Sequence, residues 1–281
     1  MTSKKEREFN FTDRDFSKIQ TLVSQHTGIV LSEAKRDMVY SRLARRLRQL
    51  NLKDFKDYCH IVENETCAEE LTHFTNAITT NLTAFYREPH HFQYLKTKLL
   101  PELMRRNAAT KTIRLWSAGC STGEEPYTLA MAIRDVIPEN SGWDVRILAT
   151  DLDTNVLNTG SNGVYGEERV KGLDKKIMRK WFLRGKNGMG GSVRVSPSLQ
   201  EMISFRQLNL MTDWPMKGPF DFIFCRNVVI YFDKPTQSVL FDRYADLLIE
   251  NGHLFLGHSE TMFKTCNRFE LIGNTIYKKK M

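Results

Sequence analysis

A short glycine-bounded segment carries the clearest chemical signal in this sequence. It is the run Gly-Cys-Ser-Thr-Gly at positions 119–123. Before it, residues 112–118 form an apolar run typical of a buried strand. After it, residues 124–136 carry apolar side chains at helical spacing, and Pro126 suits the first turn of a helix. A strand, a glycine turn and a helix start together predict a ligand-binding βα unit.

The charges beside this segment indicate the kind of ligand. Glu124 and Glu125 open the predicted helix, where they suit the helix dipole but would repel a phosphate group. The segment also lacks the glycine spacing of dinucleotide folds and the lysine of phosphate-binding loops. A second apolar run, 145–149, precedes Asp151. In nucleoside-binding sheets, an acid at the end of the second strand accepts hydrogen bonds from ribose hydroxyls. A nucleoside with a cationic, phosphate-free tail fits these features, and S-adenosylmethionine is such a molecule.

Two other interpretations of this segment remain open. It also reads Gly-x-Ser-x-Gly, the nucleophile turn of α/β-hydrolases, and the chain order allows a triad of Ser121, Asp221 and His258. Against a hydrolase, the segment follows the first recognisable strand after about a hundred mostly helical residues, and the chain has no His-Gly-Gly-Gly oxyanion segment. The other alternative is a βα turn that binds no ligand.

The elements that must position these residues begin with a helical region. Apolar periodicity predicts helices that begin at Thr12, at Ser32 and at Glu69. Residues 80–89 then read as a linker with helix caps at both ends. Pro89 begins a further helix that is expected to run to Asn107.

The rest of the chain alternates strands and helices, as in a doubly wound α/β sheet. Further buried strands are predicted at 220–225 and 252–257, and residues 269–277 predict a last one or two. Residues 163–206 interrupt this alternation. Two short apolar runs there flank a glycine-rich turn at 185–191, which predicts a small antiparallel insertion.

Composition limits the class of protein. The 281 residues are 41% hydrophobic and 11% aromatic, which is ample for one large or two modest domains. No apolar run is long enough to span a membrane, and the basic start lacks the apolar stretch of a signal peptide. Five cysteines form no Cys-x-x-Cys pair, so we expect reduced thiols, a cytoplasmic location and no metal site. The net charge of +8 is concentrated in residues 35–56 and 163–206, where nucleic acid, an anionic membrane or an acidic protein surface could bind.

Four motifs in order along the chain resemble the CheR family of chemotaxis receptor methyltransferases. They lie at 80–88, 116–127, 224–232 and 257–260. The resemblance extends from the region of Gly28 to the end of the chain.

This resemblance implies a fold and a reaction. The fold is an all-helical N-terminal domain (1–79), a linker (80–92) and an S-adenosylmethionine-dependent α/β domain (93–281) with a β-subdomain insertion (163–206). The reaction is methyl transfer to specific glutamate side chains on the cytoplasmic helices of chemoreceptors in chemotactic adaptation. Its products are glutamate methyl esters and S-adenosylhomocysteine.

The resemblance also implies roles for individual residues. Arg87 can pair with the carboxylate of the cofactor through a charge-assisted hydrogen bond, and Tyr231 matches a tyrosine near the transferred methyl group, so these two are the predicted catalytic residues. Glu125 is expected opposite the amino group and Asp151 on the ribose. The predicted cofactor-binding set is Asn81, Thr83, Arg87, Gly119, Glu125, Asp151, Asn209, Leu210, Arg226 and Asn227. Helix capping by the first two, and core packing by Tyr231, are the alternatives.

Two basic surfaces are predicted to bind the receptor. One is the arginine face of the second helix, opposite its apolar stripe, which suits acidic receptor helices. The other is the insertion, whose long glycine loop looks like that of family members that bind a peptide at the receptor's C-terminus. The predicted partner-binding residues are Arg42, Arg45, Arg48, Arg184, Gly185, Gly190 and Arg194. A solvated helix face and a hairpin without a partner are the alternatives.

The chemistry limits the number of catalytic groups to expect. A sulfonium is an activated methyl donor, and a glutamate is ionised at neutral pH, so in-line displacement needs no general base and no metal. The protein must align the reacting atoms and exclude water. Residues 227–231 lack the prolines found at this point in amine methyltransferases, which argues against a nucleic-acid substrate. A nucleic-acid methyltransferase and a catalytically silent binding module remain the alternative functions.

Overall fold

The computed structural model describes residues 7–64, 68–185 and 191–280. These form two compact units: Met1–Thr80 with Tyr231–Asp233, and Asn81–Ile230 with Lys234–Met281. In the part of the chain that is described, no helix has the length and apolar character needed to cross a membrane.

The first unit consists of helices around one apolar core. Its first helix starts at a capping box, in which Thr12 and Asp15 each accept a backbone N–H from the other, and it ends at Gly28 with a φ of 72°. Its elements are α1 (Asp13–Thr27), the 3₁₀ turn η1 (Glu33–Lys35), α2 (Arg36–Gln49), α3 (Phe55–Glu63) and α4 (Ala68–Ile78). The nine-residue helix α3 is not among the predicted helices, although its buried residues Phe55, Tyr58, Cys59 and Val62 follow helical spacing.

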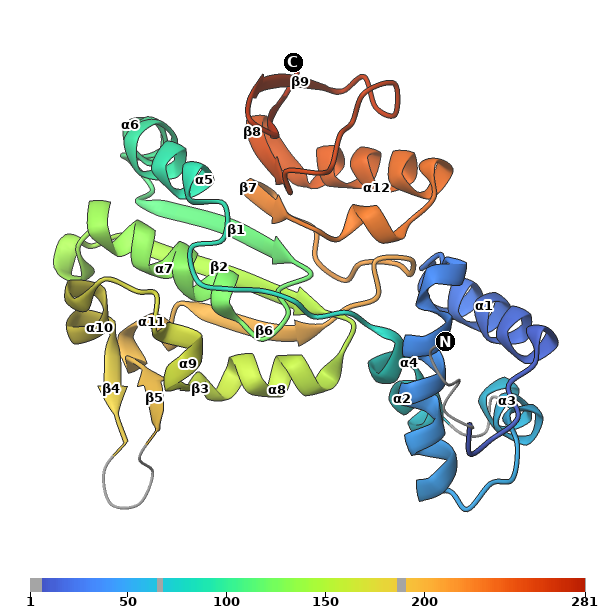
Figure 1. The fold of residues 1–281 in the computed structure, drawn as a ribbon. Helices are drawn as coiled ribbons and strands as arrows, with labels where there is room; N and C mark the ends of the chain where they lie inside the picture. Colours follow the sequence, from blue (N-terminus) through green and yellow to red (C-terminus); the bar gives the residue numbers. More distant parts are fainter. Residues whose placement is uncertain (1–6, 65–67, 186–190, 281) are drawn as a thin grey trace, which may run out of the picture. The chain divides into compact units, whose positions relative to one another are not determined.

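The second unit is built on a seven-stranded sheet in the order β6–β2–β1–β7–β8–β10–β9 (Figure 1). The first five strands in this order pair in parallel, whereas β10 is antiparallel to both of its neighbours. The strands are β1 (Thr112–Ala118), β2 (Asp144–Asp151), β6 (Ile203–Gln207), β7 (Phe220–Cys225), β8 (Leu248–Leu256), β9 (Phe269–Gly273) and β10 (Ile276–Lys279).

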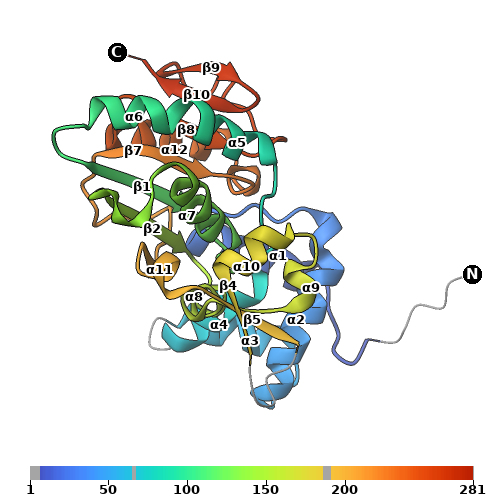
Figure 2. The same cartoon turned by 90° about the vertical axis from the view of Figure 1, so that its left-hand side faces the viewer.

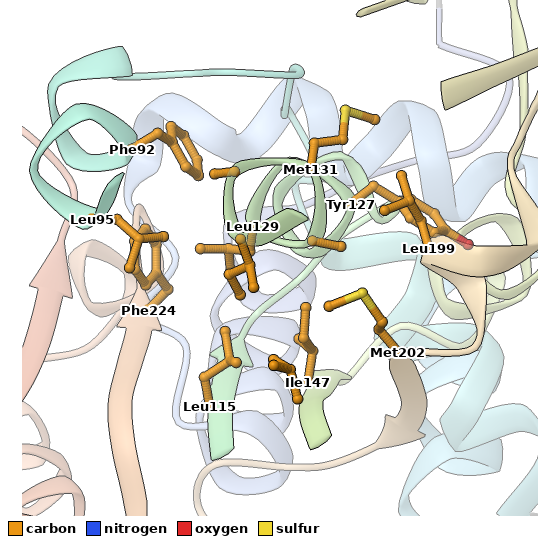
Figure 3. Packing of buried hydrophobic residues seen from close by; sticks show 14 of the residues in the cluster. Phe92, Leu95, Leu115, Tyr127, Leu129, Met131, Ile147, Leu199, Met202 and Phe224 are labelled. Carbon is orange, nitrogen blue, oxygen red and sulfur yellow. The ribbon is translucent and has the colours of Figure 1, made fainter. Parts of the chain in front are cut away.

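Helices cover both faces of this sheet, because alternate strand residues point to opposite sides. Leu115 belongs to the same buried apolar cluster as Leu129 of α7 and Phe92 of α5 (Figure 3). The next residue, Trp116, instead contacts Tyr244 of α12, with ring centroids 5.3 Å apart. The helices are α5 (Pro89–Tyr94), the π-helical turn η2 (Leu95–Leu99), α6 (Leu100–Arg106), α7 (Glu124–Val136), η3 (Glu139–Ser141), α8 (Thr154–Asn162), η4 (Val229–Tyr231) and α12 (Lys234–Leu247). The helix expected from 89 to 107 therefore contains a π-helical turn.

Within the interruption at 163–206, residues 164–200 form a separate antiparallel sheet in the order β3–β5–β4 with three short helices, whereas the end of the interruption belongs to β6 of the large sheet (Figures 1 and 2). The elements are β3 (Val164–Gly166), α9 (Glu167–Val170), α10 (Lys175–Trp181), β4 (Phe182–Arg184), β5 (Ser192–Val195) and α11 (Pro197–Gln200). Two of its three strands are the predicted ones. The predicted fold class, a doubly wound α/β sheet with a small antiparallel insertion after an all-helical region, is confirmed.

Candidate functional site

Most of the predicted cofactor-binding residues gather at the carboxyl ends of the parallel strands. The glycine segment follows β1, Asp151 ends β2, Asn209 follows β6 and Arg226 follows β7. Open α/β sheets bind their ligands at this edge. The predicted residues that are far apart in sequence are therefore brought to one place.

The glycine segment has no room for side chains at its ends. Gly119 has a φ of 77°, and a Cβ there would lie 2.3 Å from Cγ2 of Val228. Its N–H and that of Cys120 both donate to the backbone oxygen of Thr150, at 2.8 and 2.9 Å. Ser121 also has a positive φ, 49°. The backbone itself therefore lines this end of the sheet, which is how a glycine loop admits a ligand closely.

Asp151 supports that loop from the neighbouring strand. Its Oδ2 accepts the N–H of Ser121 at 2.8 Å, and its Oδ1 accepts the N–H of Asp153 at 3.0 Å. Burial raises the pKa of Asp151 to about 6, although these two hydrogen bonds act in the opposite direction. Each carboxylate oxygen has a second lone pair, so the carboxylate can still accept from a hydroxyl.

The linker contacts the same loop. The side-chain amide of Asn81 donates to Oδ2 of Asp153 at 2.7 Å, and its backbone oxygen accepts the hydroxyl of Ser121 at 2.9 Å. Thr83 is half-buried two residues further on. The guanidinium of Arg87 donates to the backbone oxygen of Leu82 at 2.8 Å.

A buried ion pair lies between the glycine segment and the end of β7. The side chain of Arg226 is 2% exposed, and its guanidinium is 3.2 Å from Oε2 of Glu125. The other carboxylate oxygen of Glu125, Oε1, accepts the hydroxyl of Ser117 at 2.7 Å. Burial raises the pKa of Glu125, while the charge of Arg226 opposes this shift. The guanidinium also lies over the rings of Phe92 and Phe224, 5.5 and 5.9 Å from their centroids.

Glu88 is a site residue to which sequence reasoning gave no role. Its Oε2 lies 3.3 Å from the guanidinium of Arg226, and its Oε1 accepts the backbone N–H of His258 and lies 2.8 Å from Nδ1 of that ring. Burial alone would raise the pKa of Glu88, but these hydrogen bonds and the charge of Arg226 lower it to about 2. Ligand atoms of Glu88, His90 and His91 lie within 4.8 Å of one another. Because Arg226 already supplies a positive charge there, we assign Glu88 to holding Arg226.

Glu260 is the second such residue, and it organises the loop after β7. Its carboxylate accepts four backbone N–H groups, from Gly257 (2.6 Å), Asn227 (2.8 Å), Val228 (2.8 Å) and Ile230 (3.2 Å). Asn227 has a φ of 60°, so its backbone must be held in this conformation. Glu88 and Glu260 could have been found from the sequence, because they lie within the family motifs at 80–88 and 257–260.

The segment after β6 is anchored beside Asp151. The N–H of Leu208 donates to the backbone oxygen of Asp151 at 2.9 Å. The side-chain oxygen of Asn209 accepts a backbone N–H two residues on, and the backbone oxygen of Leu210 accepts from Arg243 at 2.8 Å. The expected contact of this segment with adenine stays a prediction.

The hydrolase triad is not assembled. Ser121 follows the carboxyl end of β1, whereas Asp221 lies near the amino end of the parallel strand β7, where Arg106 pairs with it. His258 contacts Glu88 instead. A serine nucleophile with these partners is therefore excluded by the strand directions.

The second predicted catalytic residue, Tyr231, belongs to the first unit. It lies at the end of η4. Its role near the transferred methyl group stays a prediction.

The three arginines of α2 have different surroundings. Arg42 is half-buried, and its guanidinium donates to the backbone oxygens of Ala77 (3.1 Å) and Thr79 (2.5 Å) at the end of α4. A cation there satisfies carbonyl groups that the helix leaves unpaired. Arg45 and Arg48 are exposed. Arg42 therefore has a structural contact within the helical unit, and receptor binding by the three arginines stays a prediction.

In the insertion, strand register separates the two predicted arginines. Arg194 lies opposite Leu183 and also opposite Val164, whereas Arg184 lies opposite the buried Val193. Directly opposed residues share a face of a sheet, so Arg184 and Arg194 point to opposite faces and do not hold one group together. Gly185 is exposed at the end of β4, and Gly190 lies outside the described residues.

Comparison with known proteins identifies the family. The family model "CheR methyltransferase, SAM binding domain" matches residues 81–278, and "CheR methyltransferase, all-alpha domain" matches residues 14–79. A chemotaxis protein methyltransferase of Escherichia coli is 44% identical over 268 residues, which are 95% of this chain and 91% of that protein. Chemotaxis protein methyltransferase 2 of Pseudomonas aeruginosa is 42% identical over 275 residues, 96% of this chain and 95% of that protein. A probable chemotaxis protein methyltransferase of Rhizobium etli is 39% identical over 258 residues, with coverage of 92% and 96%. The chain belongs to the CheR methyltransferase family, and most of its second unit is that family's S-adenosylmethionine-binding domain.

Proposed function

We propose that this protein transfers the methyl group of S-adenosylmethionine to specific glutamate side chains of chemoreceptors and so acts in chemotactic adaptation. Its relatives are chemotaxis protein methyltransferases by name. The proposal adds the acceptor atom, a glutamate carboxylate oxygen, and the roles of the site residues.

The observation that carries the proposal is the distribution of charge around the glycine segment. Glu124 and Glu125 occupy the first turn of α7, so the helix start does not favour a phosphate. Arg87 stands nearby, and among the described residues it has no carboxylate within ion-pair distance. A ligand with a free carboxylate and no phosphate fits this arrangement, as the methionine end of the cofactor does.

The residues present also fit the remaining parts of the cofactor. Asp151, at the tip of β2, has spare lone pairs for ribose hydroxyls. Asn209 and Leu210 lie on the next strand end along the sheet, where the base would bind. Arg226 forms ion pairs with Glu125 and Glu88 beside the glycine segment.

The bound sulfonium supplies an activated methyl group, and the acceptor carboxylate is already ionised at neutral pH. The tasks left to the protein are to orient the two partners and to exclude water between them. Arg87 and the linker orient the methionine end, and Tyr231 is assigned to the region of the transferred methyl.

Incubation with tritiated cofactor tests the acceptor directly. We expect label on receptor cytoplasmic fragments that is lost in base as methanol, because methyl esters are labile there and methylated amines are not. RNA offered in parallel should stay unlabelled. Base-stable label, or label on RNA, would contradict the proposal.

The exposed arginines of α2 are assigned to the receptor's acidic helices. The double reversal Arg45→Glu with Arg48→Glu should raise the receptor concentration needed for half-maximal rate by about tenfold, which is ~1.4 kcal/mol. The matched control reverses two exposed charges elsewhere on the helices, Arg14→Glu with Lys56→Glu. If both double variants raise the required receptor concentration equally, the effect comes from net charge and not from the arginines of α2.

The insertion is assigned to a peptide at the receptor's C-terminus. Val164 and Leu183, 39% and 52% exposed, flank Arg194 in one row across the three strands. Two apolar side chains beside a cation suit a peptide with apolar residues and an acid. Arg194→Ala should slow methylation of receptors that carry the tail and leave tail-less receptors unaffected, because a tether acts through effective concentration. Arg184→Ala, on the opposite face, is the control, and equal slowing by both variants would contradict the assigned face.

A further inference from the structure

The insertion contacts the glycine segment and the helix start that follows it through Tyr165 and Arg169. The hydroxyl of Tyr165, on β3, donates to the backbone oxygen of Thr122 at 2.7 Å. The guanidinium of Arg169, on α9, donates to the hydroxyl oxygen of Thr122 at 3.0 Å and to the carboxylate of Glu124. Two residues from a subdomain that is otherwise assigned to docking therefore hold one turn of the cofactor loop.

The contact between Arg169 and Glu124 couples the insertion to the glycine segment, because Glu124 is buried. Its side chain is fully buried, and its carboxylate also accepts the hydroxyl of Thr122 at 2.6 Å. Among the described residues, Arg169 is the cation that pairs with it. A buried carboxylate that loses its partner is strongly destabilised, so the loop turn and the insertion are coupled through this pair.

The packing at Gly123 is equally close. Gly123 has a φ of 95°, and a Cβ there would lie 2.8 Å from Cα of Gly160 and 2.9 Å from the hydroxyl of Tyr165. The loop therefore has no space into which it can relax on this side. A change in the position of Tyr165 must be accommodated by the loop.

Tyr165 also contacts the linker. Its ring lies 5.1 Å from that of Phe85 in an edge-to-face arrangement, and Phe85 in turn meets Phe182 of the insertion at 5.5 Å. The linker also contacts α7, where the hydroxyl oxygen of Thr128 accepts the N–H of Tyr86 at 3.2 Å. The two segments that carry the proposed cofactor ligands are thus supported by the same insertion residue.

We propose that Tyr165 and Arg169 are positioning residues for the cofactor, so that the insertion sets cofactor affinity in addition to any docking role. The inference rests on the proposed assignment of the glycine segment and linker to the cofactor. Neither residue is part of the carboxyl-end cluster, and both act through Thr122, Glu124 and Phe85.

Calorimetric titration with S-adenosylhomocysteine tests the inference on the full chain. Arg169→Ala should raise its Kd about tenfold, and Tyr165→Phe, which keeps the ring but removes the donor to Thr122, about threefold, whereas the rate at saturating cofactor and receptor changes little. Lys171→Ala, an exposed charge two residues from Arg169, is the control and should bind as wild type. An unchanged Kd in folded Arg169→Ala protein would overturn the proposal.

A second variant covers the case in which Arg169→Ala does not fold. Glu124→Gln combined with Arg169→Ala removes the buried charge together with its partner, so folding should be recovered. The double variant should still bind cofactor about tenfold more weakly than Glu124→Gln alone if Arg169 positions the loop. Equal affinity of the two would overturn the proposal.

Failure of the underlying site assignment would look different. Asp151 lies on β2 of the large sheet and accepts the N–H of Ser121 in the loop. Asp151→Asn should therefore weaken cofactor binding whether or not the insertion positions the loop. If Asp151→Asn weakens binding and the Arg169 variants do not, only the positioning role is wrong. If Asp151→Asn also binds normally, the site itself is misplaced.

Discussion

Strand β7 has an arginine–carboxylate pair at each end, and the two pairs are built differently. At its amino end, Asp221 is surrounded by donors: Arg106, the side-chain amide of Asn107 at 3.1 Å and the N–H of Arg114 at 2.7 Å. At its carboxyl end, Arg226 stands between two carboxylates.

The difference lies in what each pair leaves unsatisfied. Nε of Arg226 is a buried atom without a hydrogen-bond partner in the described protein, and Oε2 of Glu88 has an ion pair with Arg226 but no hydrogen bond. No side-chain atom of Asp221 is in that position. The backbone beside Arg226 is also strained, with positive φ at Glu88 (57°) and Asn227 (60°). One end of the strand is a closed structural network, whereas the other keeps polar capacity and strain, as expected of a binding site.

The largest effect should come from Arg226→Gln. It leaves Glu88 and Glu125 buried without their cation, so the free energy of unfolding should fall by about 3–5 kcal/mol. Cofactor affinity should fall at least about a hundredfold, the equivalent of ~2.7 kcal/mol. Urea unfolding and calorimetric titration measure the two quantities. If Arg226→Gln is as stable as the wild type and binds the cofactor normally, the carboxyl end of β7 has no special role in binding.

Arg87→Ala should affect binding without affecting the fold. Its guanidinium bonds a backbone oxygen of its own linker, so its loss leaves no buried carboxylate unpaired. Loss of a hydrogen bond to the cofactor's carboxylate should weaken binding by about 1.5–3 kcal/mol. Titration against S-adenosylhomocysteine is the measurement, and unchanged affinity would make Arg87 a structural residue of the linker.

Asp221→Asn is the counterpart at the amino end. It weakens hydrogen bonds at a carboxylate that is 9% exposed, so unfolding should become easier by about 1–3 kcal/mol. Cofactor Kd and methyl-transfer rate should stay as in the wild type. A change in Kd comparable to that of Arg226→Gln would mean that both ends contribute to binding.

The pH profile of cofactor binding should reveal Asp151. Because burial raises its pKa to about 6, it is ionised above that pH and loses its charge as the pH falls through it. Affinity should be constant above neutrality and fall to a lower level as the pH drops through about 6, since the neutral acid is a poorer acceptor. The Asp151→Asn variant should bind the cofactor weakly, and its affinity should not change between neutral pH and the acid range. A step that persists in the variant would belong to another group.

Ser121→Ala should have the smallest effect. It removes the hydrogen bond to the backbone oxygen of Asn81, which costs about 0.5–1.5 kcal/mol. Methyl transfer should be largely retained, because a loop hydroxyl is not a reacting group. Rates with saturating cofactor are the readout, and abolished turnover with normal binding would give the hydroxyl a chemical role.

Much of the site could be predicted because its signals are local. The glycine segment, the acids that open α7 and the acid that ends β2 each lie within a few residues of an apolar strand. Parallel strands bring their carboxyl ends together, so the order of elements was enough to collect them. The contact of Arg42 could not be predicted in this way, because helical periodicity shows which side of α2 is polar but not that the end of α4 lies there.

The sequence by itself determined the alternation of elements, the class of ligand and the family. Only the tertiary structure decided which charges are paired, because partners such as Arg226 and Glu125 are 101 residues apart and Glu88 and His258 are 170 apart. Strand register likewise placed Arg184 and Arg194 on opposite faces, and the fold brought Arg169 to Glu124. Hydrogen bonds and burial depend on what lies nearby in space, and local periodicity carries no information on contacts between distant segments.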